Sequence, residues 1–67
     1  MSVVKVIEIL AQSEKGWKDA AQNAVTEASK TVDGIKHIYI KELQAVVENK
    51  KITEYRVNAK ISFVVGK

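Results

Sequence analysis

The sequence predicts an α+β fold of β-α-β-β order, in which a three-stranded antiparallel sheet packs on one helix. Three observations support this prediction: residues 55–65 alternate between apolar and polar with Val64 as the exception, alanines recur at helical spacing over residues 17–28, and a short polar turn separates two extended segments. The chain has 67 residues, which corresponds to a single domain covering residues 1–67.

The alternation in residues 55–65 is the strongest of these patterns. One side of an extended strand here would present Tyr55, Val57, Ala59, Ile61, Phe63 and Val65, and the other side would present Arg56, Asn58, Lys60 and Ser62. A strand with one buried and one polar face produces this period of two. The first strand, predicted over residues 3–10, is different because both of its sides are largely apolar: Val3, Ile7 and Ile9 on one, Val4, Val6 and Leu10 on the other. We therefore expect it to be covered on both faces.

A helix is predicted to follow, with Ser13 as its N-cap and Glu14 in its first turn, where the helix dipole favours a negative charge. Its apolar stripe contains Trp17, Ala20, Ala21, Ala24, Val25 and Ala28. Alanine allows a helix to lie close to a sheet but buries little apolar area, so the predicted core is small.

The rest of the chain predicts a long hairpin. Gly34 suits the left-handed conformation that is common where a helix ends and a turn begins. The next strand is predicted over residues 35–47, and residues 48–51 turn the chain into the final strand.

Composition excludes several classes of protein. The chain has no cysteine and one histidine, so neither a disulfide framework nor a Cys/His zinc site is available, and oligomerisation is the expected source of further stability. Catalysis is not expected, because no nucleophile motif or glycine-rich phosphate loop is present. With no signal peptide or apolar run of membrane-spanning length, a soluble cytoplasmic protein that does not contact membranes is expected.

The net charge of +3 arises from 11 Lys and Arg residues against 8 Asp and Glu residues, spread along the whole chain. Binding to nucleic acid usually requires a clustered basic patch, so this distribution does not favour it. A basic binding face formed by Lys41, Arg56 and Lys60 is the form that such a function would take.

The order and spacing of several segments resemble the dodecin family over nearly the whole chain. The resemblance rests on residues 4–9 (VKVIEI), 13–17 (SEKGW), the helical alanines, 30–32 (KTV), 40–43 (IKEL), 55–57 (YRV) and 61–63 (ISF). It implies a small subunit that assembles into a hollow homododecamer built from trimers, and a non-enzymatic role in binding and storing a small ligand.

The resemblance also implies a ligand, since typical dodecins bind riboflavin or FMN between tryptophans of two-fold related subunits, with a glutamine at the polar end of the ring. A gapless alignment places His37 at the tryptophan position and Arg56 at the glutamine position, and these two residues are the candidate flavin-binding residues. Imidazole offers a smaller stacking face than indole, and a guanidinium cannot accept hydrogen bonds, so weakened flavin binding is expected.

Other interpretations of these residues and of Trp17 remain open. The chain resembles the dodecins that lack this tryptophan and have been linked to calcium or to no known ligand, and an ion- or anion-binding shell is therefore the second hypothesis. Candidate calcium ligands are Asp19, Asp33, Glu42, Glu48 and Glu54, but their spacing fits no calcium loop and leaves the metal ligands unassigned. His37 is also explained as a solvated strand residue, Arg56 as the ion-pair partner of Glu54 or Glu42, and Trp17 as a packing residue.

Overall fold

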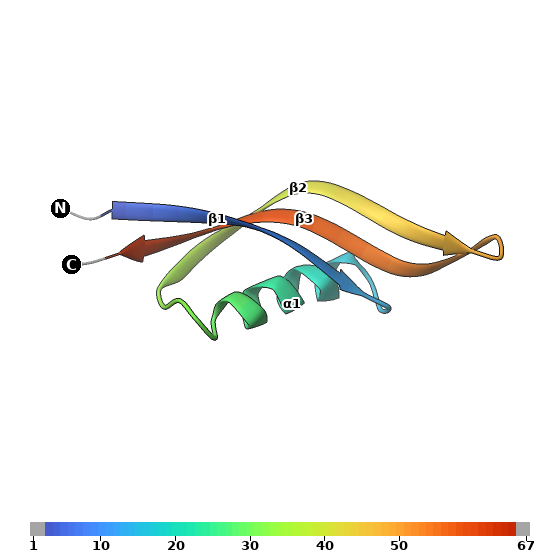
Figure 1. Cartoon of the computed structure of the whole chain (residues 1–67), viewed down its shortest axis with the longest axis horizontal. Coiled ribbons are helices and arrows are strands. Elements are labelled where there is room, and N and C mark those ends of the chain that lie inside the picture. Colours follow the sequence, from blue (N-terminus) through green and yellow to red (C-terminus); the bar gives the residue numbers. More distant parts are fainter. Residues whose placement is uncertain (1–2, 66–67) are drawn as a thin grey trace.

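The computed structural model describes residues 3–65 and has the predicted β-α-β-β order. Strand β1 (Val3–Ser13) is followed by helix α1 (Trp17–Ala28), strand β2 (Ile35–Glu48) and strand β3 (Lys51–Val65). Figure 1 shows α1 along one side of the strands, while the β2–β3 hairpin extends beyond the start of the helix. The predicted fold class is confirmed.

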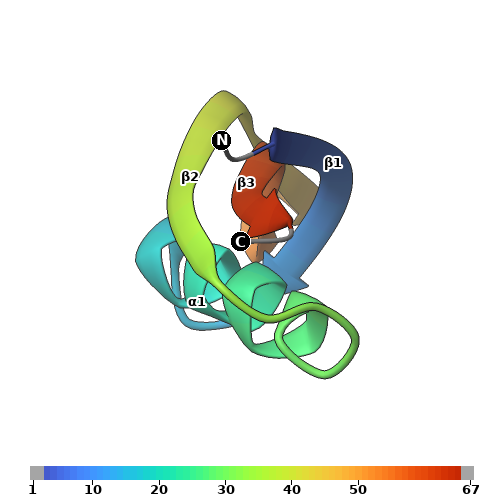
Figure 2. The ribbon, with the colours of Figure 1, turned by 90° about the vertical axis from the view of Figure 1, so that its left-hand side faces the viewer.

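Strand β3 lies at the centre of the sheet, which has the order β1-β3-β2 with both neighbours antiparallel to β3. The end-on view in Figure 2 shows β1 and β2 on opposite sides of β3, with α1 below the strands. The strand with the clearest alternation is therefore the one paired on both edges, as expected for a strand buried on one face.

The two faces of the sheet follow from the strand register. The helix face contains Val57, Ala59, Ile61 and Phe63 of β3, all buried. The face turned away from the helix, here called the open face, contains Arg56, Asn58, Lys60 and Ser62. The predicted alternation is confirmed for residues 56–63, because every apolar member from 57 to 63 is buried and no polar member is; at its two ends, Tyr55 is only partly buried and Val65 is exposed.

The core is the line along which α1 meets the helix face. Ala20, Ala24 and Ala28, here called the alanine seam, are at most 4% exposed. Ala24 and Ala28 cluster with Ile61, and six partly buried apolar residues pack around them: Ile7, Ile9, Ala11, Val32, Ile35 and Ile38. The most deeply buried part of the contact between α1 and the sheet thus consists of methyl groups, and the core has little thickness.

Strand β1 is covered on one face, where both faces were predicted to be. Ile7, Ile9 and Ala11 are partly buried beside the helix, whereas Val4, Val6 and Leu10 on the open face are each more than half exposed. The single chain has no second layer, so the apolar residues of that face remain uncovered.

The prediction for Ser13 as the helix N-cap was wrong. Ser13 is the last residue of β1, and the helix begins after Gly16, which makes no side-chain capping bond. Ser13 is nevertheless buried, and its hydroxyl donates to Asp19 Oδ2 at 2.6 Å and accepts from the Lys15 backbone N–H at 2.9 Å. It therefore ties the loop to the first turn of α1, where Asp19, rather than Glu14, is the acidic residue.

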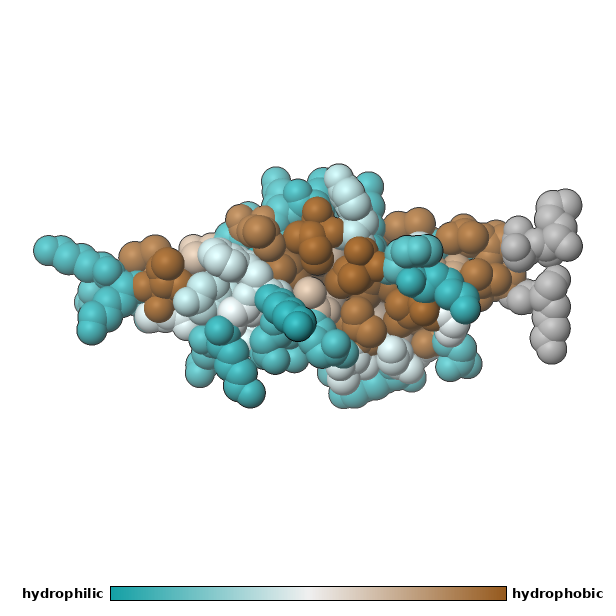
Figure 3. All heavy atoms as spheres, turned by 180° about the vertical axis from the view of Figure 1, so that it is seen from behind, coloured by the Kyte–Doolittle hydropathy of each residue, from teal (hydrophilic) through white to brown (hydrophobic). Residues whose placement is uncertain are grey.

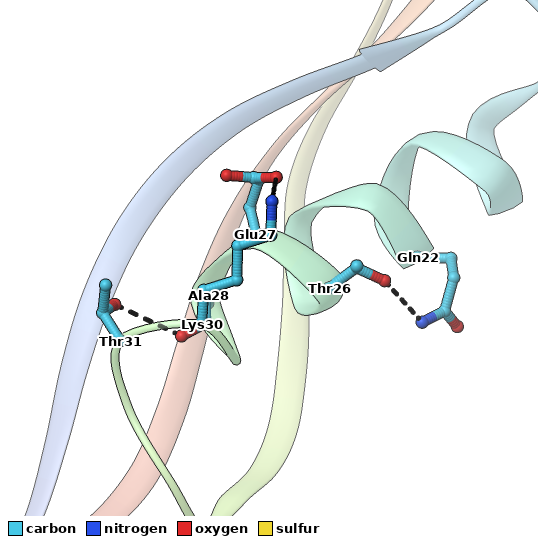
Figure 4. A network of polar contacts seen from close by, with 6 residues as sticks. All are labelled: Gln22, Thr26, Glu27, Ala28, Lys30 and Thr31. Atoms are coloured by element: carbon cyan, nitrogen blue, oxygen red, sulfur yellow. Dashed lines mark hydrogen bonds and ion pairs between the residues drawn. The ribbon is translucent and has the colours of Figure 1, made fainter.

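The end of α1 is held by a small polar network (Figure 4). The Thr31 hydroxyl donates to the Ala28 carbonyl at 3.3 Å, and the Val32 backbone N–H donates to the same oxygen at 3.0 Å. Lys30 and Glu27 form an exposed ion pair at 2.8 Å. The two bonds to the Ala28 carbonyl occupy a group that the last helical turn leaves without a partner within the helix. Gly34, with φ of 74°, then turns the chain into β2 and confirms the predicted left-handed glycine.

Strand β2 carries two of the three irregularities in its ladder with β3, the third being the shift between Val46 and Val47 that leaves Thr53 of β3 extra. Its register with β3 shifts between Ile35 and His37 and again between Ile40 and Glu42, which leaves Lys36 and Lys41 as extra residues. A β-bulge of this kind bends the strand and increases its twist. The apolar residues of β2 on the helix face therefore do not follow a period of two.

The hairpin turn places Asn49 and Lys50 in the left-handed region, with φ of 52° and 68°. Two consecutive residues with positive φ characterise the type I′ turn, whose twist matches that of the flanking strands. Asparagine tolerates this conformation, but lysine has a β-carbon that crowds the backbone and no compensating side-chain bond. The turn is thus the place where the backbone of the fold is strained.

The molecule is elongated and exposes more surface than a compact chain of its size. Its exposed area is 5125 Å², against about 4,200 Å² for a compact monomer of the same 7.4 kDa mass. Its radius of gyration is 13.7 Å, against about 11 Å for a compact domain of this length. The excess area includes many large apolar side chains, and Figure 3 shows them as a band along the face seen from behind.

We expect Lys50→Gly to stabilise the fold by about 0.5–1 kcal/mol, because glycine removes the left-handed strain at a smaller entropic cost. Denaturant unfolding at a fixed protein concentration measures the change. The matched control is Lys51→Gly, because Lys51 lies in β3 without positive φ and should lose stability. Equal effects of the two substitutions would contradict the assigned strain.

We expect Ser13→Ala to destabilise the fold by about 1–2 kcal/mol, because it removes both hydrogen bonds that tie the loop to α1. The same unfolding measurement applies. Ser29→Ala is the control, since Ser29 is exposed and its hydroxyl forms no bond within residues 3–65. A loss of equal size at both positions would show that the buried hydroxyl has no special role.

Candidate functional site

The open face is the surface on which both predicted site residues lie. Its central strand presents Arg56, Asn58, Lys60 and Ser62, and the register sets β1 and β2 residues beside each of them. The resulting cross-strand rows are Val6–Ser62–His37, Glu8–Lys60–Tyr39, Leu10–Asn58–Glu42 and Gln12–Arg56–Gln44. Adjacent side chains within a row are about 5 Å apart at their β-carbons, close enough to share a ligand.

His37 lies near one end of this face, opposite Ser62. The imidazole is exposed and forms no hydrogen bond with the residues that the structure describes. Tyr39, two residues further along β2 on the same face, is 63% exposed. The predicted position of His37 on the polar side of its strand is confirmed, and its aromatic neighbour extends the flat surface that a ligand ring would meet.

Arg56 lies toward the other end and is held by a residue that sequence reasoning missed. Its Nε donates to Gln12 Oε1 at 2.9 Å across the β1–β3 pairing. The alternative in which Arg56 pairs with Glu54 or Glu42 was wrong, because neither carboxylate forms an ion pair with it in residues 3–65. Gln12 was missed because the first strand was predicted to end at residue 10, whereas β1 continues to Ser13 and brings Gln12 opposite Arg56.

His37 and Arg56 are on the same face but do not meet. The partner of His37 on β3 is Ser62, six residues from Arg56, which corresponds to roughly 20 Å along the strand. One chain therefore cannot bring the two side chains to the same small ligand. A site that uses both residues needs a second copy of the chain. The resemblance implies the same arrangement, in which the ligand lies between two-fold related subunits.

An ion pair crosses the open face between the two outer strands. Lys41, the extra residue of the second bulge, places its Nζ 3.2 Å from Glu8 Oε2 on β1. Lys60 is the direct cross-strand neighbour of Glu8, yet it forms no ion pair within residues 3–65. Because of the bulge, the Glu8 carboxylate pairs with Lys41 and not with Lys60. Lys60, on the central strand, is therefore a cation without an acidic partner in the described chain.

Trp17 has the packing role that was predicted for it. Its indole meets the Tyr55 ring edge-to-face, with centroids 4.9 Å apart, and its Nε1 donates to the Gln44 carbonyl at 2.9 Å. These contacts tie the start of α1 to the hairpin. The indole lies over the helix side of the sheet and is remote from His37, so it cannot act as a stacking partner there.

Acidic residues do not gather into a metal site within one chain. In residues 3–65, no three His, Cys, Asp or Glu side chains lie close enough together to hold an ion. Glu42 is the carboxylate with the most suitable neighbour, because the cross-strand residue Asn58 offers a further oxygen on the open face.

Within residues 3–65, no helix is long and apolar enough to cross a membrane.

A second apolar surface lies on the helix face of the hairpin, beyond the reach of α1. It consists of Ile40, Leu43, Val47 and Ile52, here called the hairpin strip, and each of these residues is at least 37% exposed. An open hollow beside the start of α1, lined by Lys15, Gly16, Lys18, Asp19 and Gln22, is separate from both surfaces. Exposed apolar surface on two sides of one small chain is typical of a subunit.

Comparison with known proteins agrees with this architecture. The family model described as Dodecin matches residues 3–66. A curated relative named calcium dodecin, from Mycobacterium tuberculosis, is 36% identical over 63 residues, which are 94% of this chain and 89% of the relative.

Solved structures give the same result. A mutant form of the T. thermophilus dodecin superimposes with a TM-score of 0.94 at 27% identity, and the match covers 100% of both chains. The crystal structure of the M. tuberculosis calcium dodecin, described as calcium chelating, has a TM-score of 0.81 at 37% identity and covers 91% of this chain and 87% of that one. With the family model spanning almost every residue and the fold shared throughout, this chain belongs to the Dodecin family.

Proposed function

We propose that this protein is a non-enzymatic small-ligand-binding and storage protein that works as a homododecameric shell. The observation that supports this proposal best is the open face, a long surface where exposed apolar and polar side chains adjoin and which the chain's own helix does not cover. Val4, Val6 and Leu10 border the polar rows of this face, so contact with another copy would bury apolar area and enclose the polar groups between subunits.

Flavin is the first ligand to consider, with His37 and Arg56 as its contacts. The distance between the two residues within one chain means that His37 of one copy and Arg56 of another would form one site. The imidazole would stack on the ring system, and Arg56 is already oriented by Gln12 with its terminal nitrogens left to donate. Stacking on imidazole is weaker than stacking on indole, so binding weaker than that of a tryptophan-containing site is expected.

Calcium is the second candidate, because the M. tuberculosis relative is named a calcium dodecin and is 36% identical. In this chain the ion would need carboxylates from more than one copy, since calcium takes about six to eight oxygen ligands and the described residues of one chain group too few. Glu42 beside Asn58 is the pair of oxygen donors from which such a shared site could be built.

The flavin proposal is tested by titrating riboflavin and FMN with the purified oligomer, whose size is determined first, and following flavin fluorescence. We expect quenching by the natural protein and stronger quenching by His37→Trp, because the larger indole increases the stacking area. Quenching by the variant alone would show that the scaffold is kept while the natural chain has lost flavin binding. Absence of quenching in both would contradict the proposed flavin site.

The calcium proposal predicts a rise in melting temperature when calcium is added, because an ion that binds only the folded assembly stabilises it. Glu42→Gln should abolish the rise. Glu14→Gln is the matched control, since Glu14 is exposed and forms no ion pair within residues 3–65, and it should retain the rise. An equal response to magnesium, or no loss in Glu42→Gln, would contradict a specific site at this position.

A further inference from the structure

From the open face we infer that the ligand carries an anionic oxygen group, a phosphate or a carboxylate, bound by His37, Tyr39, Lys60 and Ser62. This inference rests on the proposed ligand-binding function and specifies the chemistry of its ligand. The four side chains, here called the donor patch, occupy two adjacent cross-strand rows of β2 and β3. They lie near the His37 end of the face, separate from Arg56.

The donor patch is rich in hydrogen-bond donors that the chain itself does not use. An imidazole N–H, a phenol, an ammonium and a hydroxyl adjoin one another, and none of them forms a hydrogen bond or ion pair within residues 3–65. Cross-strand neighbours are about 5 Å apart and diagonal neighbours about 7–8 Å, so their polar ends can converge on one group. A phosphate or carboxylate accepts several such bonds at once, and bonds to a charged acceptor are the stronger ones.

The carboxylate paired directly with the patch is occupied elsewhere, and the other nearby carboxylate, Glu42, lies one row further along the open face, beside Asn58. Glu8 is the cross-strand neighbour of Lys60, and without a competitor it would pair with Lys60 and neutralise it. The bulge at Lys41 instead brings a second ammonium within 3.2 Å of Glu8. Lys41 is thus a positioning residue, because by holding Glu8 it leaves Lys60 available to an anion from outside the chain.

The test compares FMN with riboflavin, which differ only by the phosphate, using the intact oligomer. We expect FMN to bind more tightly, and Lys60→Gln to weaken FMN about tenfold while riboflavin changes less than about twofold. Lys51→Gln is the matched control, because it removes the same charge from the exposed start of β3 and should leave both affinities unchanged. Higher salt should weaken FMN binding and spare riboflavin.

The role of Lys41 has its own test. Lys41→Gln leaves the four donors in place but releases Glu8, and we expect it to weaken FMN about threefold to tenfold. Adding Glu8→Gln to that variant should restore the affinity, because the competing carboxylate is then gone. A double variant that binds FMN no better than Lys41→Gln would overturn the positioning role.

Failure of this inference is distinguishable from failure of the flavin proposal. Equal binding of FMN and riboflavin, unaffected by Lys60→Gln, would overturn the anionic ligand and leave flavin binding intact. If neither flavin binds, inorganic phosphate is titrated while the NMR signals of the His37 ring and the Lys60 ammonium are followed. Shifts that disappear in Lys60→Gln and persist in Lys51→Gln would support the donor patch, and unchanged signals would overturn it.

Discussion

The contact between α1 and the sheet depends on the small size of alanine. Three methyl groups at positions 20, 24 and 28 are the most deeply buried part of the helix, and they face the buried side chains of β3. Alanine loses no rotamer freedom on burial, so this contact fixes the helix at low entropic cost. It also buries little apolar area, which leaves a core too thin to cover the sheet. The elongated shape and both exposed apolar surfaces follow from this single contact.

A thin core of this kind couples folding to assembly. The hairpin strip and the apolar margin of the open face are covered by nothing in the chain itself, so their burial would contribute stability only when copies associate. The stability of such a subunit depends on its concentration, since only the folded form associates and association therefore shifts the folding equilibrium toward it. The proposed ligand-binding residues and the exposed apolar residues lie side by side on the same three strands, so a ligand bound there would affect both ligand binding and association.

The sequence was informative where local pattern and tertiary environment agree. Residues 55–65 alternate because β3 is paired on both edges and covered on one face, and every predicted inward residue from 57 to 63 is buried. The buried alanines of the helix and the left-handed Gly34 were also predicted correctly, because in both cases the residue type suits the environment that the fold provides. The end of β1 was not, because Ser13 is a strong helix-capping residue by type, while its environment uses the hydroxyl to connect a loop.

The candidate site was only partly predictable. The resemblance selected His37 and Arg56, and the structure places both on the open face. The separation between them, the bond from Arg56 to Gln12 and the ion pair of Glu8 with Lys41 all depend on which residues lie opposite one another. That information is not local, because a bulge in β2 changes the side on which every later residue lies. The first bulge, at Lys36, shifts the alternation of inward and outward residues in β2 by one position, and the second, at Lys41, shifts it back. The sequence of β2 between the two bulges therefore shows no continuous period of two.

The bulge at Lys41 also affects how the length of this chain can change over evolution. Ile40 and Glu42 are paired with Ala59 and Asn58, which are consecutive residues of β3. Loss of the single codon for Lys41 would therefore leave a regular ladder from His37 to Val46, with every later residue of β2 still on its own face. A deletion within the regular part of the same strand would instead move all later side chains to the opposite face. This position is thus one where the gene can lose a residue while the hairpin keeps its register.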